Sequence, residues 1–175
     1  MIFWIIALGL VAMALKANWG SVTTMTSSGV TILGRLAGFD PSRLKYPGAN
    51  EEQDILVASA HAGVDARFIA AIRLAENGGP GHQYGVLNIG ANTLDAQLQG
   101  AVNTIKHFLS AYVIDSGVEP VGGDGRYTPD FIDYVANGGP SHGGWAPIGA
   151  SNDPNHLNEN WLSNVMTNYY STDLV

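Results

Sequence analysis

From residue 50 onward, apolar side chains recur at helical spacing, and each run ends at a cluster of glycine, asparagine or proline. Apolar residues three and four positions apart share one face of a helix, and a helix packs that face against its neighbours. Glycine and proline interrupt helices because glycine is conformationally free and proline lacks a backbone N–H. Little of this stretch alternates apolar and polar residues, as a half-buried strand does. The sequence therefore predicts a mainly α domain.

The pattern predicts five helices. Asn50 should cap the first, over about residues 51–62, and Glu51 in its first turn favours the positive end of the helix dipole. Asp65 should cap the second helix, which ends at Glu76 because the sequence NGGP follows it. The remaining helices are expected over residues 94–112, 129–136 and 158–170.

The chain begins with a strongly apolar segment. Residues 1–15 contain no charged side chain, and the first charge is Lys16. A helix of this length spans about 22 Å, less than the roughly 30 Å of membrane hydrocarbon. To cross the membrane, the helix must therefore continue beyond residue 15. We predict a membrane anchor over residues 1–19, with Lys16 extending to the lipid headgroups. A signal peptide cleaved near the Ala-Met-Ala sequence at 12–14 and a buried core helix are the alternatives.

Residues 20–48 separate this segment from the helical domain. They are rich in serine, threonine and glycine and contain two prolines. Because so many helix breakers occur together, we predict a spacer that acts as a tether and forms no long helix. The globular domain is then expected over residues 49–175.

The charge balance and composition limit the ligands of this chain. Eight basic residues against fifteen acidic ones give a formal net charge of −7, the wrong sign for a surface that follows a phosphate backbone. We expect no nucleic-acid partner. The chain has no cysteine, and its five histidines show no recognised metal-binding spacing such as HExxH. The sequence therefore predicts no metal and no cofactor.

Glu76 is the strongest candidate for chemistry. It ends a predicted helix, where the negative end of the dipole disfavours a carboxylate, and Leu74 and Ala75 beside it favour the protonated form by desolvation. A glutamic acid that stays neutral near the working pH can protonate a leaving oxygen, as glycoside cleavage requires. The alternative is a solvated carboxylate paired with Arg73.

Four segments, in the same order, resemble the lysozyme-like lytic transglycosylases. AGVDARFIAAIRLAENG at 62–78 looks like the family's catalytic-helix pattern AGVDPxLxxAxxxxES, with Glu76 at the glutamate. YGVLNI at 84–89 resembles the GLMQ segment, and DAQLQGAVNTIKHFLSAY at 95–112 resembles the helix that reads NIxAGAxYLxxLLxxY. YVANGGPS at 134–141 is similar to the AAYNAGP motif. The resemblance covers about residues 50–141 and implies the lysozyme-like fold that goose-type lysozymes share.

The resemblance also implies an activity. Enzymes of this family cleave the β-1,4 bond between N-acetylmuramic acid and N-acetylglucosamine in peptidoglycan. One glutamate protonates the glycosidic oxygen and then deprotonates the muramic acid 6-hydroxyl, which gives a 1,6-anhydro sugar. Carried over by position, Glu76 is the catalytic residue. The substrate-binding residues implied by the same motifs are Asn77, Tyr84, Gly85, Val86, Leu87, Asn88, Tyr134 and Asn137.

Three positions depart from the family motifs. Asn77 stands where serine is usual, Asn88 replaces the glutamine, and Ala136 replaces a tyrosine. Tyr134, two residues before Ala136, is a candidate substitute for that tyrosine. Trp145 and Tyr127 are further candidates, either for stacking on sugar faces or for packing in the core.

Two other functions stay open. A hydrolase related to goose-type lysozymes or glucosaminidases would use Asp95, Asp130 or Asp133 to hold an attacking water. A protein without activity would keep the fold for wall binding or as a structural membrane protein. The expected partners are peptidoglycan strands and a lipid membrane bound through residues 1–19. A phage virion that opens the envelope during entry and a bacterial cell envelope both fit these partners.

Overall fold

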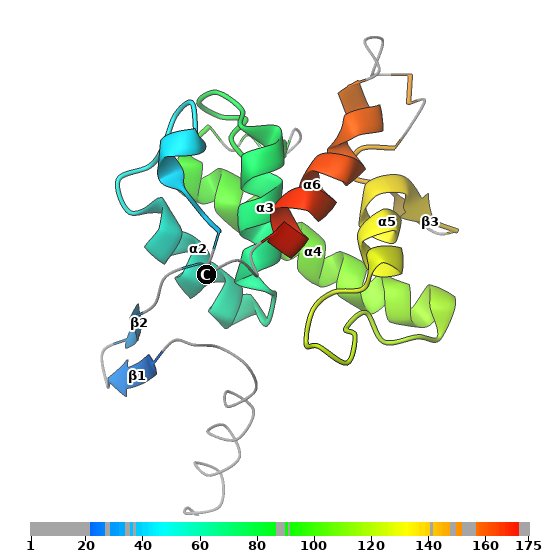
Figure 1. The fold of residues 1–175 in the computed structure, drawn as a ribbon, viewed down its shortest axis with the longest axis horizontal. Helices are drawn as coiled ribbons and strands as arrows, with labels where there is room; N and C mark the ends of the chain where they lie inside the picture. The colour runs from blue at the N-terminus through cyan, green and yellow to red at the C-terminus, as the bar shows by residue number, and fades with distance from the viewer. Residues whose placement is uncertain are drawn as a thin grey trace, which may run out of the picture. The chain divides into compact units, whose positions relative to one another are not determined.

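The computed structural model divides the chain into two compact units, Met1–Gly34 and Arg35–Val175. Figure 1 shows the elements of each unit. The predicted anchor, residues 1–19, lies outside the described residues. The structure describes residues 22–26, 29–33, 36, 38–86, 90, 92–140, 142–147, 150–151 and 157–171.

In the first unit, two short strands form an antiparallel hairpin. β1 (Val22–Thr26) pairs with β2 (Gly29–Leu33), so that Val22 lies opposite Leu33 and Thr26 opposite Gly29. The sequence predicted a tether here. Valine, threonine and isoleucine recur in this stretch, and these β-branched residues favour extended backbone. The described residues of this segment include a hairpin, which the sequence did not predict.

The second unit starts before the predicted boundary at residue 49. Leu36, Phe39 and Leu44 are buried in it, because apolar side chains of this size leave water where a core is available. Asp40 caps a 3-10 helix, η1 (Pro41–Arg43), by accepting from the Ser42 N–H at 2.9 Å. The compact unit begins at Arg35, whereas the sequence predicted a domain from residue 49.

This unit is mainly helical, as the apolar periodicity predicts. The first two helices have the predicted bounds. The third continues past Tyr112, and Gly117 ends it in the left-handed conformation, at φ 69°. The elements are α2 (Glu51–Ala62), α3 (Ala66–Glu76), α4 (Leu94–Ser116), α5 (Pro129–Asn137), β3 (Gly138–Gly139), β4 (His142–Gly143), η2 (Leu157–Asn160) and α6 (Trp161–Tyr170).

Helix α3 lies in the middle of this packing. It contacts α2 on one side and α6 on the other, while α4 contacts α2 and α5 (Figure 1). Phe68 on α3 is fully buried and meets the rings of Tyr127, Phe131 and Tyr169. Because α3 packs against a helix on each side, this packing fixes the position of its last residue, Glu76.

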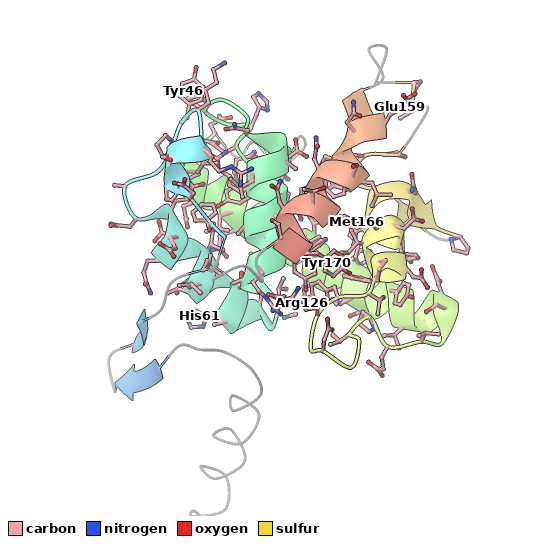
Figure 2. All side chains as sticks on the ribbon, in the orientation of Figure 1. Tyr46, His61, Arg126, Glu159, Met166 and Tyr170 are labelled. Carbon is pink, nitrogen blue, oxygen red and sulfur yellow. The ribbon has the colours of Figure 1, made fainter. Side chains whose placement is uncertain are left out.

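The outer surface carries the ends of several long side chains. Tyr46 and His61 are exposed and point outward (Figure 2). Tyr170, at the end of α6, donates a hydrogen bond from its hydroxyl to the Tyr127 carbonyl at 2.7 Å.

Among the helices of the described residues, none combines the length and the apolar character that a membrane span needs.

Candidate active site

The end of α3 is shaped by Asn77, the residue that follows Glu76. Asn77 has φ 41° and ψ 33°, and its N–H donates to the Arg73 carbonyl at 3.0 Å. Asparagine tolerates this left-handed conformation better than serine does. Its side chain accepts from the Lys45 N–H at 2.8 Å and donates to the Arg43 carbonyl at 3.2 Å. Asn77 therefore ends the helix and holds the 43–45 segment, while its predicted role in substrate binding stays a prediction.

Two tryptophans donate hydrogen bonds to one oxygen of the Glu76 carboxyl. The indole N–H of Trp145 donates to Oε1 at 3.0 Å, and that of Trp161 donates to the same oxygen at 2.7 Å. The two indoles stack on each other with ring centroids 6.1 Å apart and an interplanar angle of 24°. Glu76 as a whole residue remains partly exposed.

Gly85 lies directly against this carboxyl. A Cβ at Gly85 would lie 2.3 Å from Cδ of Glu76, and the residue has φ 70°. Both facts require glycine, since a side chain would clash and the left-handed backbone is strained for other residues. The structure thus brings together Glu76 and Gly85, two residues that the sequence analysis assigned to one site.

Burial raises the pKa of Glu76, and the hydrogen bonds from Trp145 and Trp161 partly oppose this effect. A buried carboxylate loses its hydration, whereas N–H donors stabilise the ionised form. The sequence predicted a raised pKa from the residues beside Glu76. The structure shows a further influence on this pKa, the hydrogen bonds from two indoles that lie far from Glu76 in the sequence.

Arg73 does not pair with Glu76. It is fully buried and forms an ion pair with Glu51, which is also buried. Its guanidinium also donates to the carbonyls of Tyr46 at 2.9 Å and Gln83 at 3.3 Å. This arrangement excludes the predicted alternative of an Arg73–Glu76 pair. It also corrects the role of Glu51, which is a buried partner of α3 as well as a first-turn residue of α2.

Tyr84 joins this buried group. Its hydroxyl donates to Oε1 of Glu51 at 3.2 Å, and burial raises its pKa well above the usual range. The side chain is fully buried, so it cannot face a sugar, and its predicted substrate-binding role is corrected. Tyr84 instead fixes the chain immediately before Gly85 to helices α2 and α3.

Gln97 on α4 holds the same loop from the other direction. Its side-chain oxygen accepts from the N–H groups of Tyr84 and Val86, both at 3.3 Å, and its amide donates to the Val86 carbonyl at 2.8 Å. The Val86 backbone is therefore bonded within the protein, and its predicted sugar contact stays a prediction for the half-exposed side chain. Gln97 was not predicted, because nothing local in the sequence marks a polar residue that bonds a distant loop. The neighbouring predictions, Leu87 and Asn88, lie outside the described residues.

Tyr134 and Asn137 on α5 each donate a hydrogen bond to an aspartate. The Tyr134 hydroxyl donates to Asp115 at 2.7 Å, and its ring packs on Phe108 and Tyr112. Tyr134 is thus part of the α4–α5 packing, and it does not replace the family tyrosine. Asn137 is exposed and donates to Asp133 at 3.0 Å.

The turn after α5 positions Trp145 next to Glu76. β3 pairs with β4, and the chain then runs back along α5, with the N–H of Trp145 bonded to the Val135 carbonyl at 2.7 Å. A Cβ at Gly144 would lie 2.1 Å from the Ala136 carbonyl oxygen. Glycine is therefore required for this close return. The Gly-rich sequence after α5 positions one of the two indole donors.

The other aromatic candidate, Tyr127, belongs to the core. It is buried, and its hydroxyl accepts from the Asp65 N–H at 3.0 Å. Among the described residues, no group of three or more histidine, aspartate or glutamate side chains is arranged to bind a metal.

No family model, curated protein or solved structure matches this chain. The contacts around Glu76 therefore carry the functional interpretation. They include one carboxyl group with a raised pKa, two neutral N–H donors on one of its oxygens, and a glycine backbone against it. Within the described part of the chain, both hydrogen-bond partners of this carboxyl are indoles, and neither is a second acid.

Proposed function

We propose that this chain cleaves the glycan strands of peptidoglycan as a lytic transglycosylase, with Glu76 as the general acid and then the general base. The observation that carries the proposal is the carboxyl of the partly exposed residue Glu76, whose pKa is raised by burial and which accepts both indole N–H groups on one oxygen. A carboxyl with a raised pKa keeps its proton to higher pH than an ordinary glutamic acid, so it can donate that proton to a bound substrate.

The chemistry needs one carboxyl group. Glu76 donates its proton to the glycosidic oxygen between the two sugars, and the bond from that oxygen to C1 of the muramic acid breaks. The 6-hydroxyl oxygen of the same muramic acid bonds to C1 and passes its proton to Glu76, which restores the acid. The products are a free N-acetylglucosamine 4-hydroxyl and a 1,6-anhydro sugar. A glycosidase that uses two carboxylates would need a second acid for the water or the nucleophile.

The aspartates considered for a hydrolase have other roles. Asp95 and Asp130 are exposed first-turn residues of α4 and α5, where a negative charge suits the helix dipole. Asp133 accepts a hydrogen bond from Asn137. These placements favour the single-acid reaction.

We extend the proposal to a lysozyme-like fold for the helical unit and to a membrane anchor over residues 1–19. The anchor would keep the enzyme near the wall and raise its local concentration there. A phage virion and a bacterial envelope both fit.

The test uses the full-length chain on purified sacculi, with muropeptide products identified by mass spectrometry. Transglycosylation gives 1,6-anhydro ends, whereas a hydrolase gives reducing ends that carry oxygen from labelled water. Glu76→Gln should lower the rate at least about a hundredfold, because general acid catalysis contributes about 10²–10⁴. The glutamine carbonyl can still accept both indole N–H groups, so the fold should be kept.

Glu119→Gln is the matched control, since Glu119 is exposed and the chemical change is the same. Its rate should equal that of the unaltered chain. Equal lysis by the Glu76 and Glu119 variants would remove Glu76 as the acid. Binding of sacculi without any cleavage by the unaltered chain would favour the wall-binding alternative.

A further inference from the structure

Both indole N–H groups at the site point to the same atom. Trp145 and Trp161 donate to Oε1 of Glu76 at 3.0 and 2.7 Å, and neither bonds to Oε2. An indole N–H is only a donor, and its hydrogen cannot be turned to accept one. Oε1 must therefore act as an acceptor whether Glu76 is ionised or neutral.

This asymmetry determines where the proton of the neutral acid lies. A protonated carboxyl has one hydroxyl oxygen and one carbonyl oxygen, and the carbonyl oxygen has two lone pairs. With two donors aimed at Oε1, a proton on that oxygen would face two N–H hydrogens. The proton of neutral Glu76 therefore lies on Oε2.

We propose that Trp145 and Trp161 are positioning residues, which hold the Glu76 carboxyl in one orientation so that Oε2 carries the proton transferred to the substrate. This inference rests on the proposed function. The indoles come from different elements, one after the hairpin that follows α5 and one at the start of α6, and they stack on each other. Because the two indoles belong to separate elements, the orientation of the carboxyl depends on both elements.

No charged group competes with the indoles at this carboxyl within the described residues. The effects on its pKa are burial and the two indole bonds. Arg73, one turn earlier on α3, is paired with Glu51. On the neighbouring elements, Glu159 and His82 are exposed, and the His142 ring contacts His107. Loss of an indole N–H should therefore act directly on Glu76.

The sharpest test removes only the N–H. 3-Benzothienylalanine has nearly the shape of tryptophan but carries sulfur in place of the indole N–H, so its packing is kept and its donor is lost. It is incorporated at position 145 or at position 161 of the full-length chain. The titration of Glu76 is followed by ¹³C NMR of its side-chain carboxyl carbon, and the rate on sacculi is measured against pH.

We expect three changes with either analogue. The pKa of Glu76 should rise, because a bond that stabilises the ionised form is lost while burial stays. The fall in rate at high pH should move to higher pH with it, since the first step needs the protonated acid. The maximal kcat should fall about tenfold, because a carboxyl that can rotate presents its proton less often.

Tyr112→Phe is the control for an aromatic change in the core. Tyr112 is buried against Phe131 and Tyr134 and has no contact with Glu76 among the interactions of the described residues. Its variant should keep the Glu76 titration and the pH profile of the unaltered chain. If the tryptophans had a purely structural effect, the analogues would lower kcat but would change neither the Glu76 titration nor the pH profile.

The outcomes separate this inference from the proposed function. An unchanged Glu76 pKa in both analogues would overturn the inference, and so would an unchanged kcat with a raised pKa. A raised pKa in a chain without transglycosylase activity would support the indole bonds and overturn the proposed function.

Discussion

The indole N–H of Trp161 donates to Oε1 of Glu76 at 2.7 Å, across 85 positions of the chain. Trp161 is the first residue of α6, and Glu76 is the last residue of α3, so the contact joins the ends of two packed helices. Any change in the packing of α6 on α3 therefore reaches the carboxyl. Stability and chemistry are coupled at this point, and stability can be used to study the site.

Glu76→Gln should make the protein less sensitive to rising pH. Burial raises the pKa of Glu76 in the folded chain above that of the unfolded chain. The group therefore contributes stability below the unfolded pKa, and this contribution is lost as pH rises through the folded pKa. The glutamine cannot ionise. The free energy of unfolding of the variant, relative to the unaltered chain, should increase from pH 4 to pH 8 in urea titrations.

The matched variant for this measurement is again Glu119→Gln, whose side chain is exposed. Its difference from the unaltered chain should stay constant over the same pH range. A constant difference for the Glu76 variant as well would mean that burial does not raise the Glu76 pKa.

Glu51→Gln should destabilise the fold strongly. It leaves the buried Arg73 guanidinium without its anionic partner, and breaking such a pair by removing one side costs about 3–5 kcal/mol. Denaturant titration measures this loss. Asp54→Asn, an exposed change on the same helix, should cost less than about 0.5 kcal/mol. Similar effects of the two variants would contradict the buried pair.

A second variant distinguishes the pair from simple loss of packing. Glu51→Leu combined with Arg73→Met removes both charges and keeps apolar volume. Replacement of both partners of a buried ion pair is often neutral or stabilising. The double variant should therefore recover much of the stability that Glu51→Gln loses, although the Tyr84 hydroxyl also loses its acceptor.

Local sequence signals predicted the part of the site that depends on neighbouring residues. Asp65 begins α3 and the residue after Glu76 ends it, as expected from capping preferences. The raised pKa of Glu76 also followed from its place at an apolar helix end. The two helix ends are determined within a few positions of the chain, whereas the buried carboxyl also meets Gly85 and the two tryptophans from other segments.

The rest of the site depends on contacts between distant segments. Trp145 and Trp161 reach Glu76 across 69 and 85 positions, and a single sequence shows no pattern for such pairs. The same holds for Glu51 and Arg73. In the sequence each resembles an ordinary surface charge of its own helix, and their pairing follows only from the packing of α2 on α3. The burial of Tyr84 follows from that packing, so its predicted exposure to substrate was wrong.

Tyr134→Phe should lower stability and leave the reaction intact. The change removes a hydroxyl that donates to Asp115 at 2.7 Å, and a hydrogen bond to a charged group contributes about 1.5–3 kcal/mol. The ring packing on α4 is kept. Unfolding titrations should show this loss, while the rate on sacculi at 25 °C stays within about twofold. A loss of rate without loss of stability would instead support the substrate-binding role that the sequence suggested.

Gly85→Ala tests how closely the loop approaches the acid. The new Cβ would lie 2.3 Å from Cδ of Glu76, so the carboxyl or the loop must move. A misplacement of about 1 Å at a reacting group can lower a rate about a hundredfold. Gly63→Ala is the control, because Gly63 has φ 72° against 70° for Gly85 but no atom within 4 Å of its Cβ position. Both variants should lose about 1 kcal/mol of stability from backbone strain, measured by urea titration. A fall in rate that is confined to Gly85→Ala would therefore come from contact with Glu76, whereas equal rates in the two variants would mean that this loop does not touch the acid.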